Sequence, residues 1–423
     1  MNIWFVTIGE PIPHAENKLR LHRTGILTKF ISENSNSKVI WWTSNFNHFT
    51  KEHIFEGEKD FDVNQNLRLI ALSGKGYKRN VSVDRIIDHK QIANSFRKRI
   101  AITVKPDIII VSFPTLELCE ICTDFGNKYN VPVIIDYRDM WPEVFLDIIP
   151  SILKPLGQFI LSPLFRKTRK VFTSATGLIG ITNEFLKLGL LKARRNNNEY
   201  DAVFPLAYLR NQYSQKDIDT ADLFWKEKLV NKSYKLRICF FGTLGHQFDF
   251  DTVVSAVELL NMENITDFEI VLCGSGDKEI QLRESAAKLK GIILPGYMGA
   301  AQIRTLLELS DIGLCPYNVN KAFLSSIPGK AIEYMSAGLP LLSTLENGEL
   351  GKLIDENKIG YHYEFGNPIA LANKIKELIK IKGHLRELHP QIFDCYLKNF
   401  NAESIYFNYF DHIKQVVIKF NGR

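Results

Sequence analysis

The feature that most constrains the fold is a succession of short apolar runs, separated by segments with helical spacing, that occurs once in each half of the chain. The first half has the runs NIWFVTIG, KVIWWTS, LRLIAL, PDIIIVSFP and VPVIIDY; the second has LRICFFG, FEIVLCGSG, GIILPG, DIGLCPY and LPLLST. Continuous Val and Ile runs are typical of strands that helices cover on both faces. The sequence therefore predicts two doubly wound α/β domains with parallel sheets.

A polar stretch between about Leu190 and Leu236, with weak apolar periodicity, separates the two halves. The chain of 423 residues is also long enough for two separate cores. We place the first domain at residues 1–200 and the second at 201–395. Because ligands bind outside the carboxyl ends of parallel strands, we expect the binding site in a crevice between the two sheets.

The basic character of the chain belongs to its first half. The formal charge is +6, but residues 1–200 hold 28 Lys and Arg against 20 Asp and Glu, which leaves 25 against 27 for the rest. Such a surface favours anionic partners, for example phospholipid headgroups or pyrophosphate-linked lipids. We expect no nucleic acid partner, because no base-stacking motif accompanies the charge.

Three further patterns bear on the compartment. Cys119 and Cys122 form the one close cysteine pair, and we favour buried helix positions over a metal or redox site. No segment has the roughly eighteen apolar residues that a membrane span needs, and the N-terminus has no basic leader. We expect a cytoplasmic protein. The segment 148–172, with five basic residues and no acidic one, is either an interfacial membrane segment or a core-facing helix with a basic outer face.

Two strands of the second half end in glycines just before a helix, in CFFGTLG and VLCGSGD. Gly242, Gly245, Gly274 and Gly276 would let a ligand approach backbone N–H groups at a helix N-terminus. Neither stretch matches the dinucleotide-binding fingerprint, and a simple strand-to-helix turn is the alternative.

The stretch SSIPGKAIEYMSAGLPLLST, residues 325–344, places Glu333 inside a short apolar helix. A carboxylate there is costly unless something bonds it. The two hydroxyl groups of a ribose would do so, and a cap or a salt bridge to a lysine is the alternative.

The run from residue 325 to 344 resembles the donor-binding motif of family 4 glycosyltransferases. The stretch IIDYRDMWPE is similar to the Asp-x-Arg-Asp-Leu-Trp-Pro-Glu signature of the members that build capsule and O-antigen chains on a lipid carrier. The likeness continues through ATGLIGITNEFLKLG, FFGTLG, IVLCGSGD and LLELSDIGLCPY, in order and over nearly the whole chain.

The resemblance implies a GT-B fold: two Rossmann-like domains facing a central cleft, an acceptor-binding N-terminal domain, a donor-binding C-terminal domain, and a helix at 396–423 that returns to the first domain. It implies a retaining, metal-independent enzyme without a cofactor. The expected reaction moves an amino or deoxy hexose from a nucleotide diphosphate sugar, with UDP favoured over GDP, to a polyprenyl-pyrophosphate-linked oligosaccharide at the inner face of the cytoplasmic membrane.

On the donor side, the resemblance assigns Glu333 to the ribose hydroxyls. The sugar-contacting glutamate of the family falls at Ser325, so we expect the serine and the Pro328–Gly329 backbone to contact the sugar. The arginine and lysine that stabilise the leaving phosphate fall at Thr243 and Phe248. We therefore expect the N–H groups of Gly242–Gly245 and Lys330 to meet that charge, with His246 as a lesser candidate.

On the acceptor side, the resemblance points the loop after VPVIIDY into the cleft. We expect Asp139 or Glu143 to orient or deprotonate the acceptor hydroxyl and Arg138 to steady phosphate or carboxylate charge. The alternative is a structural Arg-carboxylate cluster with Trp141 packed beneath it. We also expect basic residues of the first loop to bind the acceptor pyrophosphate, although Lys18 and His22 suit a solvated helix start equally; the set is His14, Lys18, Arg20, His22 and Arg23.

Two other functions fit these motifs. A nucleotide-sugar 2-epimerase of the same fold would bind UDP-sugar without an acceptor. A catalytically silent, membrane-associated scaffold would explain the missing glutamate, arginine and lysine.

Overall fold

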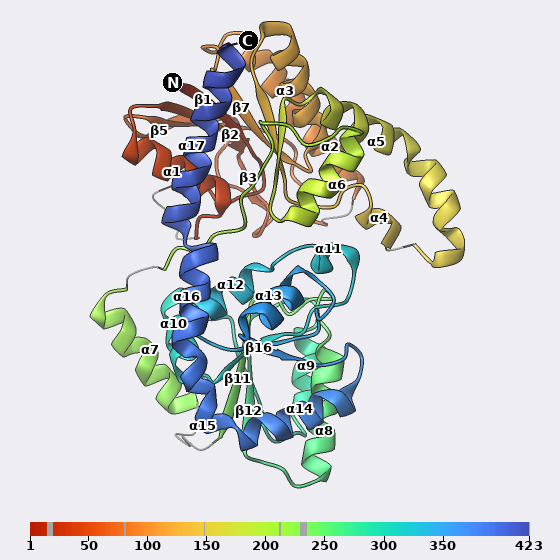
Figure 1. Cartoon of the computed structure of the whole chain (residues 1–423), viewed down its shortest axis with the longest axis vertical. Coiled ribbons are helices and arrows are strands. Elements are labelled where there is room, and N and C mark those ends of the chain that lie inside the picture. Colours follow the sequence, from red (N-terminus) through yellow and green to blue (C-terminus); the bar gives the residue numbers. More distant parts are fainter. Residues whose placement is uncertain (15–19, 80–81, 148, 211–212, 229–234, 423) are drawn as a thin grey trace. The chain divides into compact units, whose positions relative to one another are not determined.

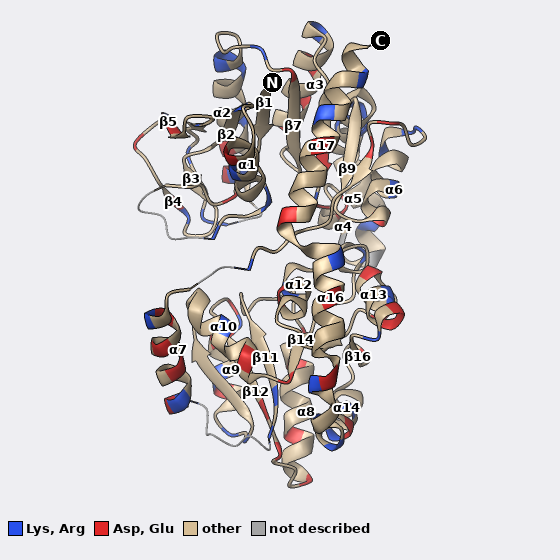
Figure 2. Cartoon of the chain, turned by 60° about the vertical axis from the view of Figure 1, so that its left-hand side comes forward, with Lys and Arg blue, Asp and Glu red and all other residues tan. Residues whose placement is uncertain are grey.

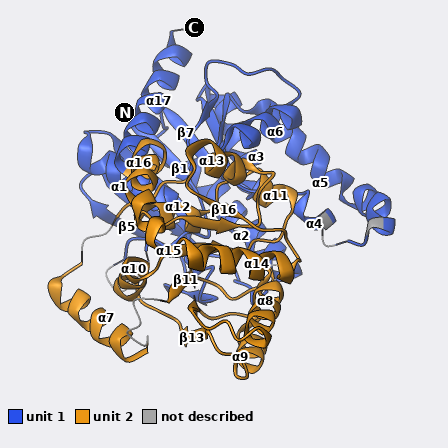
Figure 3. Cartoon of the chain, turned by 60° about the horizontal axis from the view of Figure 1, so that its bottom comes forward, with its two compact units in different colours: residues 1–205, 403–423 blue, residues 206–402 orange. Residues whose placement is uncertain are grey.

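The computed structural model describes residues 1–14, 20–79, 82–147, 149–210, 213–228 and 235–422 (Figure 1). The chain forms two compact units, one of residues 1–205 with 403–423 and the other of residues 206–402 (Figure 3). The first unit runs past our boundary at 200 because β10 (Ala202–Val203) pairs with β9 (Gly177–Gly180). The second runs past 395 because α16 (His389–Phe400) packs on α12 (Gly329–Ser336).

The first unit is built on an eight-stranded sheet of order β10-β9-β8-β7-β1-β2-β6-β5. All neighbouring strands are parallel except β5, which runs antiparallel to β6. The strands β1 and β7 carry no charged residue, whereas the surrounding helices do (Figure 2). Besides β9 and β10, the sheet contains β1 (Asn2–Val6), β2 (Lys38–Ser44), β5 (Lys59–Asn64), β6 (Leu67–Leu72), β7 (Ile108–Phe113) and β8 (Val133–Tyr137). A separate small hairpin consists of β3 (Phe46–Asn47) and β4 (Glu52–His53).

Helices of the first unit begin and end where the chain supplies caps. The Ser82 hydroxyl accepts a hydrogen bond from the Arg85 N–H at the start of α2, and Asn130 adopts the left-handed conformation that ends α3. The helices are α1 (Arg23–Asn34), α2 (Val83–Ile100), α3 (Leu116–Tyr129), α4 (Val144–Asp147), η1 (Ser151–Leu153), α5 (Lys154–Ser174), α6 (Asn183–Ala193) and α17 (Ala402–Asn421). Residues 403–421 of α17 return to this unit, where the Tyr409 ring stacks on Phe204.

The second unit has a six-stranded, fully parallel sheet of order β13-β12-β11-β14-β15-β16. Its strands are β11 (Leu236–Phe241), β12 (Phe268–Cys273), β13 (Ile292–Gly296), β14 (Ile312–Cys315), β15 (Leu341–Ser343) and β16 (Gly360–His362). Its other helices are α7 (Gln215–Lys228), α8 (Phe250–Met262), α9 (Glu279–Ala286), α10 (Ala300–Leu309), α11 (Lys321–Leu324), α13 (Glu349–Asn357), α14 (Pro368–Lys380), α15 (Lys382–Leu385) and η2 (Arg386–Leu388).

Both sheets have the strand order of a dinucleotide-binding fold. The second unit follows the order 3-2-1-4-5-6, and the first unit contains the same order with β10 and β5 added at its edges. The strand order reverses beside β1 in one sheet and beside β11 in the other. The loops at the carboxyl ends of these strands are therefore where each unit is expected to bind a ligand.

The loops after β11 and β12 are joined by backbone contacts. The N–H of Gly242 donates to the Cys273 carbonyl at 2.9 Å, and the N–H of Leu244 donates to the Ser275 carbonyl at 2.9 Å. Gly274 has φ +141°, and a Cβ there would overlap the carbonyl oxygen of Gly242. A glycine is thus required at 274 for both its backbone conformation and the close approach of the two loops.

We expect Gly274→Ala to lower the free energy of unfolding of the second unit by about 3 kcal/mol, because the side chain adds steric overlap to a strained backbone. Urea unfolding followed by circular dichroism measures this change. The matched control is Gly383→Ala in α15, where a Cβ meets nothing within 4 Å. Equal midpoints for the two variants would contradict the interpretation.

Candidate active site

In the second unit, hydrogen bonds of a tyrosine side chain attach α12 to the sheet. The buried Tyr334 hydroxyl lies 3.2 Å from the carbonyl oxygens of both Cys239 and Leu314, within β11 and β14. One residue earlier, the half-buried Glu333 accepts a hydrogen bond from the Tyr208 hydroxyl at 3.1 Å. The Tyr208 carbonyl in turn accepts one from the Tyr396 hydroxyl of α16 at 2.9 Å. The Glu333 carboxylate is therefore held in a defined place.

Glu333 lines a cavity of about 770 Å³ between α10, α12 and α16. The guanidinium of Arg210 lies 5.0 Å from the Phe393 ring, and that of Arg304 lies 5.7 Å from the Tyr213 ring. The polar and aromatic side chains that line the cavity are Tyr208, Arg210, Tyr213, Arg304, Glu308, Glu333, Ser336, His389 and Phe393. Arg304 pairs with Glu308 at 3.0 Å. The Glu333 carboxylate, the Arg210 guanidinium and the aromatic faces are groups that can bind a nucleotide.

Lys330 lies one helical turn before Glu333 and reaches back to the end of β11. Its ammonium is 4.9 Å from the Phe248 ring and 5.5 Å from the Phe240 ring. A Cβ at Gly242 would lie 2.5 Å from the Lys330 Cε, so the glycine leaves room for the lysine. Burial lowers the pKa of Lys330, and the Glu333 carboxylate opposes this shift in part. The lysine supplies a positive charge beside the β11 loop.

The other residues expected on the donor side have varied surroundings. Phe248 is a core residue that packs on Phe240, Phe250 and Tyr317, while Thr243 and His246 are exposed. The N–H groups of Gly242 and Leu244 already donate to carbonyl groups of the β12 loop, which departs from the phosphate-binding role that we expected for them.

The remaining donor-side positions lie around the start of α12 and between the two glycine loops. Ser325 is buried at the end of α11, and Pro328 caps α12. A Cβ at Gly329 would meet nothing within 4 Å, so the first turn of α12 is open there. Gly276 packs against the Leu244 carbonyl, and Gly245 lies beside the Gln247 side chain.

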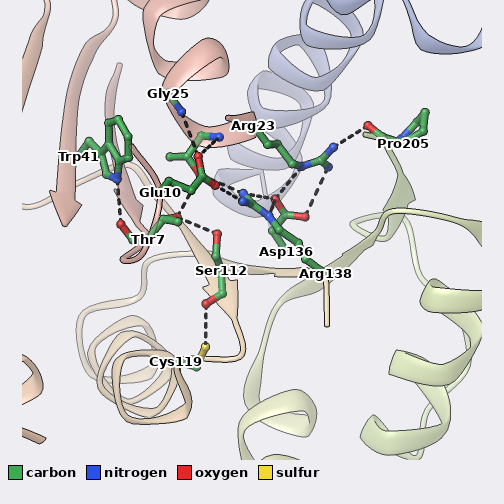
Figure 4. A network of polar contacts seen from close by, with 11 residues as sticks. Thr7, Glu10, Arg23, Gly25, Trp41, Ser112, Cys119, Asp136, Arg138 and Pro205 are labelled. Carbon is green, nitrogen blue, oxygen red and sulfur yellow. Dashed lines mark hydrogen bonds and ion pairs between the residues drawn. The ribbon is translucent and has the colours of Figure 1, made fainter. Parts of the chain in front are cut away.

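In the first unit, Arg138 and Arg23 belong to a buried ionic network (Figure 4). Asp136 is fully buried, and its Oδ2 lies 3.0 Å from Arg23 Nε and 2.7 Å from Arg138 Nη2. Burial raises the pKa of Asp136, but the two guanidinium groups outweigh it and the net pKa is lowered. Arg23 also donates to the Pro205 carbonyl at 2.6 Å. The Arg-carboxylate cluster that we considered as the alternative is thus present.

Glu10 completes this network, and sequence reasoning missed it. Its carboxylate pairs with Arg138 and accepts hydrogen bonds from the backbone N–H groups of Thr24 at 2.9 Å and Gly25 at 3.4 Å. The Thr24 hydroxyl donates to the same carboxylate at 2.8 Å. The chain therefore places its own anion at the N-terminus of α1. The available signal was a glutamate directly after the first apolar run.

The structure separates the three acceptor-side residues of the motif IIDYRDMWPE. Arg138 is in the ionic network, and Glu143 pairs with Lys192 of α6. Asp139 is exposed and lines a cavity of about 150 Å³ at the carboxyl ends of β1, β2 and β7. The Trp141 ring contacts Arg85, whose guanidinium is 5.3 Å from it, and its packing beneath the Arg138 cluster stays a prediction.

The cavity beside Asp139 contains groups that sequence reasoning did not select. Burial, with Lys51 and Arg85 nearby, lowers the pKa of His48 to about 4, and burial with Arg85 lowers that of His89 to about 4. Both imidazoles are therefore neutral at pH 7, and His48 Nδ1 shares a 2.6 Å hydrogen bond with the Tyr77 hydroxyl. The cavity is lined by His48, Tyr77, Arg85, Asp88, His89 and Asp139, with others. Such groups can bind a ligand rich in hydroxyl groups.

The basic residues of the first loop that the structure describes have different partners. His14 contacts the Phe55 and Phe61 rings, His22 contacts the Phe49 ring, and Arg23 is buried against Asp136. Arg20 is exposed, and Lys18 lies outside the described residues.

Several structural features bear on cofactors and membranes. Among the described residues, no group of three or more His, Cys, Asp and Glu side chains could hold a metal ion; metal independence stays a prediction. All six cysteines are buried and free, and burial raises the pKa of the Cys119 and Cys122 thiols. We find no helix in the described parts of the chain with the length and apolar character that a membrane crossing requires.

Comparison with known proteins relates most of the second unit to a known family. Residues 222–391 match the family described as Glycosyl transferases group 1. The chain is 25% identical over 291 residues to the probable glycosyltransferase WbjE from Pseudomonas aeruginosa. This alignment covers 65% of the chain, and the chain spans 64% of the length of this curated relative.

Solved structures establish the fold of the whole chain. Sucrose-phosphate synthase from Thermosynechococcus elongatus superposes with a TM-score of 0.72 at 13% identity over 99% of both chains. HepE from Anabaena in complex with UDP superposes with a TM-score of 0.65 at 12% identity over 98% of this chain and 100% of its own. The chain has the GT-B fold, with two Rossmann-like units.

We expect Asp136→Asn to lower the free energy of unfolding of the first unit by about 3–5 kcal/mol, because it leaves two buried guanidinium groups without their shared carboxylate. Urea unfolding monitored by tryptophan fluorescence measures the loss. The control is Asp84→Asn, whose exposed ion pair with Lys75 should contribute less than about 1 kcal/mol. A loss at Asp136 no larger than at Asp84 would show that the network is not structural.

Proposed function

We propose that this chain is a retaining glycosyltransferase that moves a hexosyl group, an amino or deoxy hexose, from a nucleotide diphosphate sugar to a polyprenyl-pyrophosphate-linked oligosaccharide. The observation that carries the proposal is the pairing of Glu333 and Lys330 on one helix beside the β11 loop, within the glycosyltransferase domain. The carboxylate faces a nucleotide-sized cavity, and the ammonium lies where phosphate charge would need it.

The donor would lie across α12. Glu333 accepts hydrogen bonds from the two ribose hydroxyl groups, as its bond from the Tyr208 hydroxyl orients it to do. Lys330 binds the leaving phosphate in place of the arginine and lysine that the family has in the β11 loop. The open first turn at Gly329 and the adjacent Ser325–Pro328 backbone face the transferred sugar. UDP is the favoured nucleotide, since HepE, of the same fold, was solved with UDP.

In the reaction, the bond from the anomeric carbon to the leaving phosphate oxygen breaks while the acceptor oxygen bonds to the same face of that carbon. The leaving phosphate takes the proton of the acceptor hydroxyl. Stabilising this phosphate is the largest electrostatic demand of such a step. Lys330 can meet that demand without a metal ion, which supports metal independence.

The acceptor would lie in the first unit, in the cavity that Asp139 lines. Asp139 orients the acceptor hydroxyl, and Arg85 with the neutral His48 and His89 hydrogen-bonds the sugar. Arg138 and Glu143 are positioning residues in this proposal, because their charges are paired within the chain. The basic first half and the signature IIDYRDMWPE support a lipid-linked acceptor, a role in capsule or O-antigen synthesis, and weak attachment to the inner face of the cytoplasmic membrane.

We expect Glu333→Ala to weaken UDP binding by about ten- to a hundredfold, because a charged hydrogen bond worth about 1.5–3 kcal/mol is lost. Isothermal titration calorimetry with UDP, GDP and ADP measures the loss and identifies the base. Glu356→Ala, at an exposed position of α13, is the control and should bind as the unchanged chain does. If none of the three nucleotides binds the folded protein, the result contradicts the donor site and favours the catalytically silent scaffold.

We expect Asp139→Asn to keep UDP affinity but to slow sugar transfer by about 10²-fold, because the carboxylate that orients the acceptor hydroxyl is lost. UDP release in the presence and absence of a lipid-linked acceptor measures transfer and hydrolysis separately. Asp124→Asn, at an exposed position of α3, is the matched control and should retain the transfer rate. Turnover of UDP-sugar to its epimer without any acceptor would instead support the 2-epimerase.

A further inference from the structure

The end of η1 and the first half of α5 together expose a stripe of large apolar side chains. Ile152, Leu153, Leu156, Phe159 and Ile160 have exposed fractions of 87, 49, 56, 77 and 65%. Their spacing of one, four, seven and eight residues from Ile152 places them on one side of the helix. A surface helix normally turns such a stripe toward the core, so this one is available to something outside the unit.

The two halves of α5 differ in how they pack. In the second half, Thr168, Val171 and Phe172 are buried, and the Phe172 ring lies 5.0 Å from that of Phe113 and 5.2 Å from that of Tyr137. In the first half, the side that carries Gly157 is covered by Leu146 and Ile149, which a Cβ at 157 would contact. Figure 1 shows α4 and the first half of α5 projecting from the rest of the first unit. The stripe, residues 152–160, is therefore held on a rigid projection.

The charge next to the stripe is entirely positive within this segment. Residues 149–174 contain five basic side chains and no acidic one. Lys167 and Lys170 pair with Glu120 on α3, at 2.8 and 3.6 Å. Arg166 and Arg169 are exposed and line a hollow of about 410 Å³ with Gln158, Ser162 and Phe165, directly after the stripe.

We propose that the stripe inserts into the interface of an anionic lipid bilayer, with Arg166 and Arg169 on lipid phosphate groups. An apolar stripe that is followed along the same helix by two exposed guanidinium groups suits a surface that is apolar inside and negatively charged at its headgroups. The inference rests on the proposed function, because the proposed polyprenyl-linked acceptor lies in a membrane. An enzyme that uses it has to work at the membrane surface. The surface itself follows from the exposed residues.

The experiment is co-sedimentation of the full chain with vesicles of phosphatidylcholine and phosphatidylglycerol in equal parts, and of phosphatidylcholine alone. The unchanged chain should bind the anionic vesicles. The double variant Phe159→Asp with Ile160→Asp should reduce the partition coefficient about tenfold or more, because it places two charges in the apolar stripe. Arg166→Gln with Arg169→Gln should lower it about fivefold per residue on the anionic vesicles only.

The matched control is Ile102→Asp with Val104→Asp, which changes equally exposed apolar residues of the same unit and should leave vesicle binding unchanged. UDP affinity, measured on every variant, should not change, so failure of the membrane surface is distinguishable from failure of the donor site. Unchanged vesicle binding by the stripe variant, or no binding by the unchanged chain, overturns the proposal. So does a dimer that the stripe variant dissociates, because the stripe then serves a second copy of the chain.

Discussion

The first unit depends on one buried carboxylate. Asp136 is the penultimate residue of β8 and is shared by Arg23, at the start of α1, and Arg138, in the loop that follows β8. Through Arg138 it is linked to Glu10 after β1, and through Arg23 to the carbonyl of Pro205 at the end of the unit. Burying charges is costly, and such a group is tolerated where each charge has a partner and the remaining polar atoms are hydrogen-bonded. One residue thus fixes the relative positions of two strand ends, a helix start and the end of the segment 1–205.

The second unit depends on a different constraint, which is the small space available for side chains between its loops. The loops after β11 and β12 approach so closely that glycine is needed at 274, and the same lack of a side chain at 242 admits Lys330. Phe248 supports the lysine from below. A cation that the resemblance leads one to expect in the β11 loop is supplied here from α12, three residues before the carboxylate proposed to bind the ribose.

Sequence reasoning predicted the central strands well because their continuous Val and Ile runs reflect burial on both faces. It missed edge strands such as β5 and β16, whose half-exposed residues lack that pattern. At the site, the sequence shows which residue types are present but not which groups they contact. An arginine suits an acceptor phosphate or a buried carboxylate equally, and the structure places Arg138 beside the buried carboxylate of Asp136. The low pKa of His48 and His89 comes from burial by segments that are distant in the sequence, so it cannot be predicted from the sequence around either histidine.

The buried cysteines make the chain convenient for spectroscopy. All six thiols lie inside the two units, and burial raises the pKa of Cys239, Cys273 and Cys315 as it does that of Cys119 and Cys122. Thiolates react with maleimides and methanethiosulfonates, whereas buried thiols are inert. A cysteine introduced at an exposed position in each unit would therefore take a spin label or fluorophore selectively, without removal of native residues. The distance between two such labels, measured with and without a nucleotide, would then report the separation of the units in each state.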